Sequence, residues 1–108
     1  MNDIRYQHRS LDVACELGAA DSPGRAAEWR RLREQAGLGA ISIPGGARLW
    51  LRPTAADVAR DLVRREAACC GFLDLELATD GDRLHLDVTS PAPGAGPVIS
   101  SLTGVDPR

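Results

Sequence analysis

Residues 62–77, LVRREAACCGFLDLEL, contain the point where the hydrophobic spacing changes from that of a helix to that of a strand. Up to Cys70 the apolar residues recur at helical spacing, and Gly71 is typical of a helix end. After Gly71, leucines alternate with other residues, as in a half-buried strand. The stretch therefore predicts a helix that leads directly into a strand.

Glu66 occupies an unusual position in this helix. On a projection at about 100° per residue, it lies in the middle of the apolar stripe, with Cys69 and Cys70 one turn further along the same stripe. A carboxylate there is costly to desolvate unless it is paired, coordinated or protonated. Glu66, Cys69 and Cys70 are therefore the candidate site.

Upstream of this helix, the sequence predicts a strand, a helix and a hairpin. Residues 10–17 alternate as a strand with Cys15 on its inner face, and residues 22–36 have the spacing and end signals of a helix. A hairpin with a three-residue loop, 44–46, follows. With that loop, the inward apolar residues are Ile41, Ile43, Ala47, Leu49 and Leu51.

The helix that carries the site is expected to begin at a Thr54 cap. Beyond the site, a second hairpin turns at Asp80-Gly81 and places His85 opposite Glu76 as a surface pair. A short helix is expected within residues 96–104. The inward residues of the second hairpin are Leu73, Leu75, Leu77, Leu84, Leu86 and Val88.

The order β-α-β-β-α-β-β-α predicts an α+β fold in a single domain, 1–108, with flexible ends at 1–9 and 104–108. We expect a two-layer sandwich with an antiparallel sheet and helices on one face. Its simplest version is a ferredoxin-like βαββαβ core with a C-terminal β-hairpin arm and a short helix.

Composition excludes several classes of function. The 108 residues have a formal net charge of −2, which provides no basic surface for nucleic acid or an anionic membrane. There is no apolar run of transmembrane length and no apolar stretch typical of a signal peptide near the N-terminus. We therefore expect a cytoplasmic protein. The 13 arginines without any lysine are typical of a GC-rich bacterial genome.

The cysteines favour a metal site. An odd number, three, argues against a disulfide framework, so Cys15, Cys69 and Cys70 are expected to be free thiols or ligands. Two or three sulfurs with one carboxylate suit a thiophilic metal or metalloid, and also zinc. Neither His8 nor His85 is placed to add a ligand. The leading hypothesis is therefore sequestration, transfer or detoxification of such an ion.

Two explanations compete with metal binding at this group. Cysteines pack as small hydrophobes, and a buried glutamate binds an arginine or a backbone donor from the neighbouring layer. Alternatively, one thiol of Cys69 or Cys70 is the nucleophile of a small enzyme acting on an organic substrate, with Glu66 as acid or base. Thiols at a helix C-terminus face the negative end of its dipole, which raises their pKa, so the enzyme is the weaker hypothesis.

Trp50 indicates a third kind of function. It lies on the open face of the expected sheet between Arg48 and Arg52, whereas Trp29 has the spacing of a core residue. An aromatic side chain flanked by arginines favours a homodimer interface or a ligand platform. On this hypothesis the protein is a non-catalytic interaction module.

The run from Arg65 to Pro91 resembles a group of small uncharacterised bacterial proteins with a Glu-x-x-Cys-Cys-x-Phe-Leu/Phe motif followed by a hairpin. The resemblance implies that Glu66, Cys69, Cys70 and Phe72 are the motif positions, and it assigns no chemistry because that group has no settled activity. The residue types are also similar to those of organomercurial lyases, but the spacing differs, so that likeness is chemical only.

Overall fold

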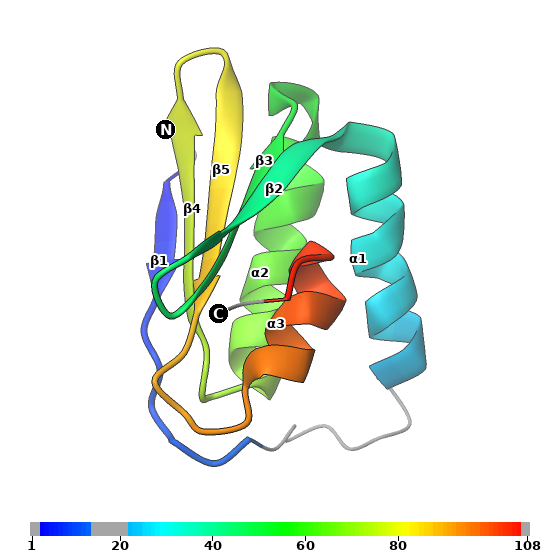
Figure 1. Cartoon of the computed structure of the whole chain (residues 1–108). Coiled ribbons are helices and arrows are strands. Elements are labelled where there is room, and N and C mark those ends of the chain that lie inside the picture. The colour runs from blue at the N-terminus through cyan, green and yellow to red at the C-terminus, as the bar shows by residue number, and fades with distance from the viewer. Residues whose placement is uncertain (1–2, 14–21, 107–108) are drawn as a thin grey trace.

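A computed structural model describes residues 3–13 and 22–106, and their secondary structure is shown in Figure 1. Five strands form one antiparallel sheet in the order β1-β4-β5-β3-β2. The strands are β1 (Ile4–Tyr6), β2 (Gly37–Ile43), β3 (Gly46–Leu51), β4 (Asp74–Asp80) and β5 (Arg83–Thr89). The helices are α1 (Ser22–Ala36), α2 (Ala56–Cys69) and α3 (Gly96–Thr103), with a 3-10 turn η2 (Pro53–Ala55) before α2.

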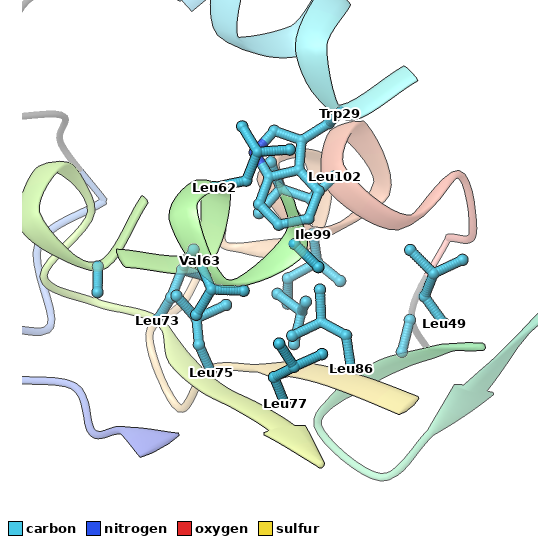
Figure 2. Packing of buried hydrophobic residues seen from close by; sticks show 14 of the residues in the cluster. Trp29, Leu49, Leu62, Val63, Leu73, Leu75, Leu77, Leu86, Ile99 and Leu102 are labelled. Atoms are coloured by element: carbon cyan, nitrogen blue, oxygen red, sulfur yellow. The ribbon is translucent and has the colours of Figure 1, made fainter. Parts of the chain in front are cut away.

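The core lies between the sheet and the helices, which are on the same side of the sheet in Figure 1. Buried residues alternate with more exposed ones along most of β3, β4 and β5, so one face of these strands is covered and the other is more open. Trp29 of α1, Leu62 of α2 and Ile99 of α3 belong to the same buried cluster as the strand leucines (Figure 2). The predicted antiparallel α+β architecture is therefore confirmed.

The ferredoxin-like order is not confirmed. Residues 10–13 form no strand, and Leu11 and Val13 are exposed; the remainder of the predicted strand, 14–17, lies outside the described residues. The first strand is instead β1, in the part of the chain expected to be a flexible end, and it pairs with β4. The described strands thus form antiparallel pairs, whereas a split βαβ unit needs a parallel pair.

The first hairpin has a shorter loop than predicted. Ile43 pairs with Gly46, which leaves a two-residue loop, Pro44-Gly45, in place of the predicted three residues. A change of one residue moves a whole strand face to the other side. Ile41 therefore pairs with Arg48 on the open face and is 48% exposed, and Ala40 takes the inner position opposite Leu49. The predicted inward positions of Ile41 and Ile43 are wrong.

Glycine explains where this loop ends. A Cβ on Gly46 would collide with the backbone of Val88 and Thr89, so β3 can approach β5 closely only because a glycine occupies this position. Gly45 has a φ of 80°, in the left-handed region that a tight turn requires. Both glycines therefore end the turn one residue earlier than predicted, at Gly45.

The second hairpin is also shifted, but its core face is as predicted. Asp80 pairs with Arg83, so the loop is Gly81-Asp82 and not Asp80-Gly81. The loop still has two residues, so the alternation of inner and outer faces is unchanged. The predicted inward residues Leu73, Leu75, Leu77, Leu84, Leu86 and Val88 are all buried. His85 now lies opposite Ala78 and not opposite Glu76, which corrects the predicted pair.

Helix α2 begins and ends near its predicted limits. Its N-cap is Ala55, without a side-chain cap, and the predicted cap residue Thr54 lies in the 3-10 turn before it. At the other end, the backbone N–H of Cys70 donates to the carbonyl of Glu66. In the described part of the chain, no helix combines the length and apolar character needed to cross a membrane.

Candidate functional site

Glu66, Cys69 and Cys70 lie together at the C-terminal end of α2, where Cys70 is the C-cap. One ligand atom from each, a carboxylate oxygen and the two sulfurs, lies within 4.8 Å of the others, and all three residues are buried. Glu66 is only 4% exposed although it is a carboxylate. The predicted grouping of these three side chains on the covered face of the helix is confirmed.

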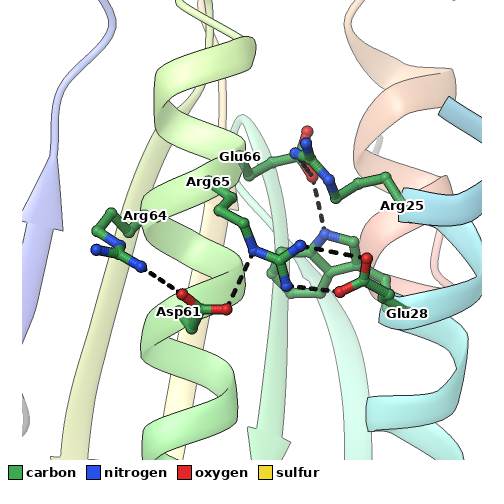
Figure 3. A network of polar contacts seen from close by, with 7 residues as sticks. Arg25, Glu28, Asp61, Arg64, Arg65 and Glu66 are labelled. Carbon is green, nitrogen blue, oxygen red and sulfur yellow. Dashed lines mark hydrogen bonds and ion pairs between the residues drawn. The ribbon is translucent and has the colours of Figure 1, made fainter. Parts of the chain in front are cut away.

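The partners of Glu66 come from α1. The indole Nε1–H of Trp29 donates to Oε1 over 2.8 Å, and Arg25 Nη1 lies 3.6 Å from the same oxygen (Figure 3). Trp29 and Arg25 are four residues apart, so they share one face of α1. These two residues are the partners that a buried carboxylate needs. One of them is an arginine from the neighbouring helix, as expected if Glu66 has a purely structural role. Trp29 was expected only as a core residue.

The other oxygen of Glu66 accepts a hydrogen bond from Cys70. The sulfur donates to Oε2 over 3.0 Å along one turn of α2. Burial raises the pKa of the Cys70 thiol to about 12, helped by the hydrogen bond to Glu66 and its charge, and Arg25 and Arg9 oppose part of this rise. The predicted direction of the pKa shift is confirmed, but burial is its first cause. The thiol is therefore protonated at neutral pH.

Cys69 differs from the expectation of a free thiol. It is disulfide-bonded, while Cys70 is a free, buried cysteine. The expectation was based on the odd number of cysteines and on a reducing compartment, and neither forbids a single disulfide. A disulfide sulfur is not a thiolate ligand, so the group can hold a metal through Cys69 only after reduction. Cys15, the fourth predicted ligand, lies outside the described residues.

Arg9 closes the C-terminal end of α2 beside this group. Its guanidinium donates to the carbonyls of Ala67 and Ala68 over 2.7 and 3.0 Å, and the backbone N–H groups of Arg9 and Ser10 both donate to Gly71. A cation here satisfies carbonyls that have no partner within the helix. The site thus has an arginine on each side, Arg25 from α1 and Arg9 from the N-terminal segment.

A second row of ion pairs joins α1 and α2 next to Glu66. Arg65 donates to both oxygens of Glu28, over 2.5 and 3.2 Å, and its Nε lies 3.1 Å from Asp61 (Figure 3). Arg65 is paired with two partly exposed carboxylates on the helix surface, those of Glu28 and Asp61, so we assign it a structural role. The pair of Arg65 with Glu28 joins α2 to α1 and so helps to keep Trp29 and Arg25 in place over Glu66, while Asp61 holds Arg65 from its own helix.

The open sheet face carries a second cluster of polar side chains. Glu76, His85 and Asp87 each offer a ligand atom within 4.8 Å of the others, but Asp87 already accepts two hydrogen bonds from Arg48, over 2.6 and 2.8 Å. His85 Nδ1 lies 3.9 Å from a carboxylate oxygen of Asp80. His8 lies elsewhere on this face, hydrogen-bonded to Asp74.

Trp50 lies on this open face, as predicted, but its neighbours differ. The guanidinium carbons of Arg83 and Arg48 lie 5.0 and 6.0 Å from its ring centroid. Arg52, the predicted second neighbour, instead donates to the carbonyl of Gln35. Arg83 comes from the neighbouring strand β5, so its position could not be obtained from the spacing along β3.

No family model, no curated protein and no solved structure matches the chain.

Proposed function

We propose that the reduced protein binds one thiophilic metal or metalloid ion at Glu66, Cys69 and Cys70, for sequestration, transfer or detoxification. The observation that carries the proposal is the convergence of two sulfurs and a carboxylate within 4.8 Å in a buried site. Soft ions select thiolate ligands, and a buried site excludes competing water. Zinc is included among the ions to be tested.

The surrounding residues support such a role. Trp29 and Arg25 hold the carboxylate of Glu66 in one orientation beside the sulfurs of Cys69 and Cys70. The protonated thiol of Cys70 argues against the cysteine-dependent enzyme, because a thiol nucleophile reacts as the thiolate, whereas a bound metal ion itself deprotonates the thiol that ligates it. Binding and not catalysis is therefore the function that we propose.

The proposal has a redox condition. Because Cys69 is disulfide-bonded in the structure, its sulfur becomes a ligand only when a cellular thiol reduces it. This condition fits the cytoplasmic location expected from the sequence, where thiols stay reduced. The oxidised form is expected to bind no ion at this group.

Titration of the reduced protein tests the proposal. Mercury(II), arsenite, copper(I), cadmium and zinc are added separately to wild type, Cys69→Ser and Cys70→Ser, and bound ions are counted by elemental analysis after desalting. We expect one ion per chain in wild type and at least a ~100-fold loss of affinity in each serine variant, since each removes one of the two soft ligands. Equal, weak binding by the three proteins would contradict the proposal.

Two controls separate ligand loss from other effects. Cys15→Ser tests the fourth predicted ligand, whose loss should weaken binding only if its sulfur takes part. Wild type that has been oxidised and not reduced should bind as weakly as Cys69→Ser. Far-UV circular dichroism and thermal melting establish that each variant remains folded.

A further inference from the structure

The carboxylate of Glu66 is poorly available to a metal cation. Oε1 accepts the indole N–H of Trp29, and Arg25 Nη1 lies 3.6 Å away. Loss of the Cys70 thiol proton would free Oε2, but the guanidinium would remain beside the carboxylate. A divalent cation held by Glu66 would therefore lie close to a fixed positive charge in the protein interior, where screening by water is weak.

Arg25 also has a donor without an acceptor. Its side chain is only 13% exposed, and Nη1 is buried without a hydrogen-bond partner among the described residues. Leaving a buried donor unpaired is costly, more so when the group is charged. An oxygen atom carried in by a ligand would supply the missing acceptor.

We propose, on the basis of the function proposed above, that the ligand of this site is a trivalent metalloid hydroxide, of which arsenous acid is the simplest, and not a divalent cation. Arsenic(III) forms three bonds, and Cys69 and Cys70 supply two sulfurs. The third bond keeps one of the ligand's own oxygens, which accepts the unpaired N–H of Arg25. Structural zinc sites, by contrast, almost always use four protein ligands, and this group offers three.

The reaction is a condensation without a change in oxidation state. Two S–H bonds and two As–O bonds break, two As–S bonds form, and two hydroxyl groups leave as water with the two thiol protons. Glu66 already accepts the S–H of Cys70, so it is placed to pass that proton to a departing hydroxyl. Before this, a dithiol must reduce the Cys69 disulfide by exchange and is itself left as a disulfide.

Calorimetry on the reduced wild-type chain tests the inference. The protein is reduced with a dithiol, freed of it without oxygen, and titrated with sodium arsenite, zinc chloride and cadmium chloride in two buffers of different ionisation enthalpy. We expect arsenite to bind at least ~10-fold more tightly than zinc and to release almost no protons. Zinc or cadmium, if bound by both sulfurs, should release about two protons, because a thiol must be deprotonated before it ligates a cation.

The outcomes separate this inference from the proposed function. Tight binding of cadmium or zinc that is lost in Cys69→Ser, with no arsenite binding, would overturn the inference and leave the proposed function standing. Binding of none of these ions, nor of mercury(II) or copper(I), would overturn both. Arsenite binding that is unchanged in both serine variants would also overturn the inference.

Two arginine variants test the role of Arg25. Arg25→Met removes the unpaired donor and should weaken arsenite binding by about ten-fold, while zinc binding stays the same or becomes tighter. Arg30→Met is the matched control, because Arg30 lies on the same helix but is exposed and paired with Glu34. Unchanged arsenite binding in a folded Arg25→Met protein would overturn the role of Arg25.

If Arg25→Met does not fold, Arg25→Lys retains the charge but not the fork of donors, and it should lose part of the arsenite affinity. If the Arg25→Lys protein binds arsenite as tightly as wild type does, the proposed hydrogen bond from Arg25 Nη1 to the ligand is wrong. The ratio of arsenite to zinc affinity and the proton count are measured on wild type, so they decide the ligand class whatever the stability of the variants.

Discussion

Two groups of polar side chains in this protein use similar residues in different surroundings. On the covered side of the sheet, Glu66 is paired with Arg25, and their side chains are 5% and 13% exposed. On the open side, Asp87 is paired with Arg48, and their side chains are 16% and 34% exposed. The open pair has the better geometry, with two short hydrogen bonds, whereas Arg25 approaches Glu66 only to 3.6 Å.

Burial and not geometry therefore distinguishes the two groups. A carboxylate removed from water must keep its partners, because an uncompensated buried charge costs several kcal/mol, whereas a half-exposed one regains water when its partner is lost. The Glu66 group should thus dominate both stability and ligand chemistry, and the Asp87 group should affect both only slightly.

Replacing Glu66 and Glu76 by alanine should give the largest difference in stability between the covered and the open face. Glu66→Ala leaves Trp29 Nε1 and Cys70 without their acceptor, leaves Arg25 without its ion pair and opens a cavity, so we expect a loss of ~3–5 kcal/mol in the free energy of unfolding. Glu76→Ala on the open face should cost less than ~1 kcal/mol. Urea unfolding of both variants measures these values. Equal costs would show that burial does not separate the groups.

The Cys70 thiol should make stability depend on pH. Its pKa is raised in the folded protein, so the folded state binds the proton more tightly than the unfolded chain. Its contribution is complete below the unfolded pKa near 9.0 and is lost as pH rises toward the folded pKa of about 12. Across this window wild type should lose up to about 1.4 kcal/mol per pH unit relative to Cys70→Ala.

Unfolding in urea at about pH 8 and about pH 11 measures this difference, with reduced protein in both cases. Parallel pH profiles for wild type and Cys70→Ala would contradict it. In reduced wild type, iodoacetamide at neutral pH should modify Cys70 only after unfolding. Fast alkylation of the folded protein would instead favour the cysteine-dependent enzyme.

The Arg48–Asp87 pair should contribute about 1 kcal/mol, because both side chains are only partly buried. A double-mutant cycle with Arg48→Ala and Asp87→Ala measures the coupling between them. The more exposed pair of Arg64 and Asp61 is the matched control and should give only a few tenths of a kcal/mol. A coupling of several kcal/mol at Arg48–Asp87 would mean that the open face is covered in solution.

Substitution of Trp50 tests whether a second copy of the chain covers the open sheet face. The homodimer expected from the sequence predicts that sedimentation equilibrium gives a dimer for wild type and a monomer for Trp50→Ala, with little change in the stability of the chain itself. Trp29 cannot serve as the control because it is part of the Glu66 group, so Trp50→Phe, which keeps an aromatic side chain, is used and should remain a dimer. The same mass for wild type and Trp50→Ala would argue against an interface through Trp50.

Most of the core could be predicted because the alternating leucines of the second hairpin stay on the same face even when the turn is misplaced by one residue. Its turn is displaced by one position, but a two-residue loop keeps Leu75, Leu77, Leu84 and Leu86 on the covered face. In the first hairpin the loop is one residue shorter than predicted, and this alone moves Ile41 to the open face. Alternation predicts that a strand has two faces, but the loop length decides which of them is covered.

The sequence by itself determined that Glu66 lies among apolar residues beside Cys69 and Cys70, because these positions are separated by single turns of one helix. It could not determine what meets Glu66, because Trp29 is 37 residues away on another helix and only the packing of α1 against α2 joins them. The same holds for the strand order and for the disulfide of Cys69. Local spacing specifies which residues share one face of a helix or strand, whereas the packing of one face on another depends on the whole chain. At this site, that packing places Arg25 beside Glu66, and the inference of a metalloid ligand depends on Arg25.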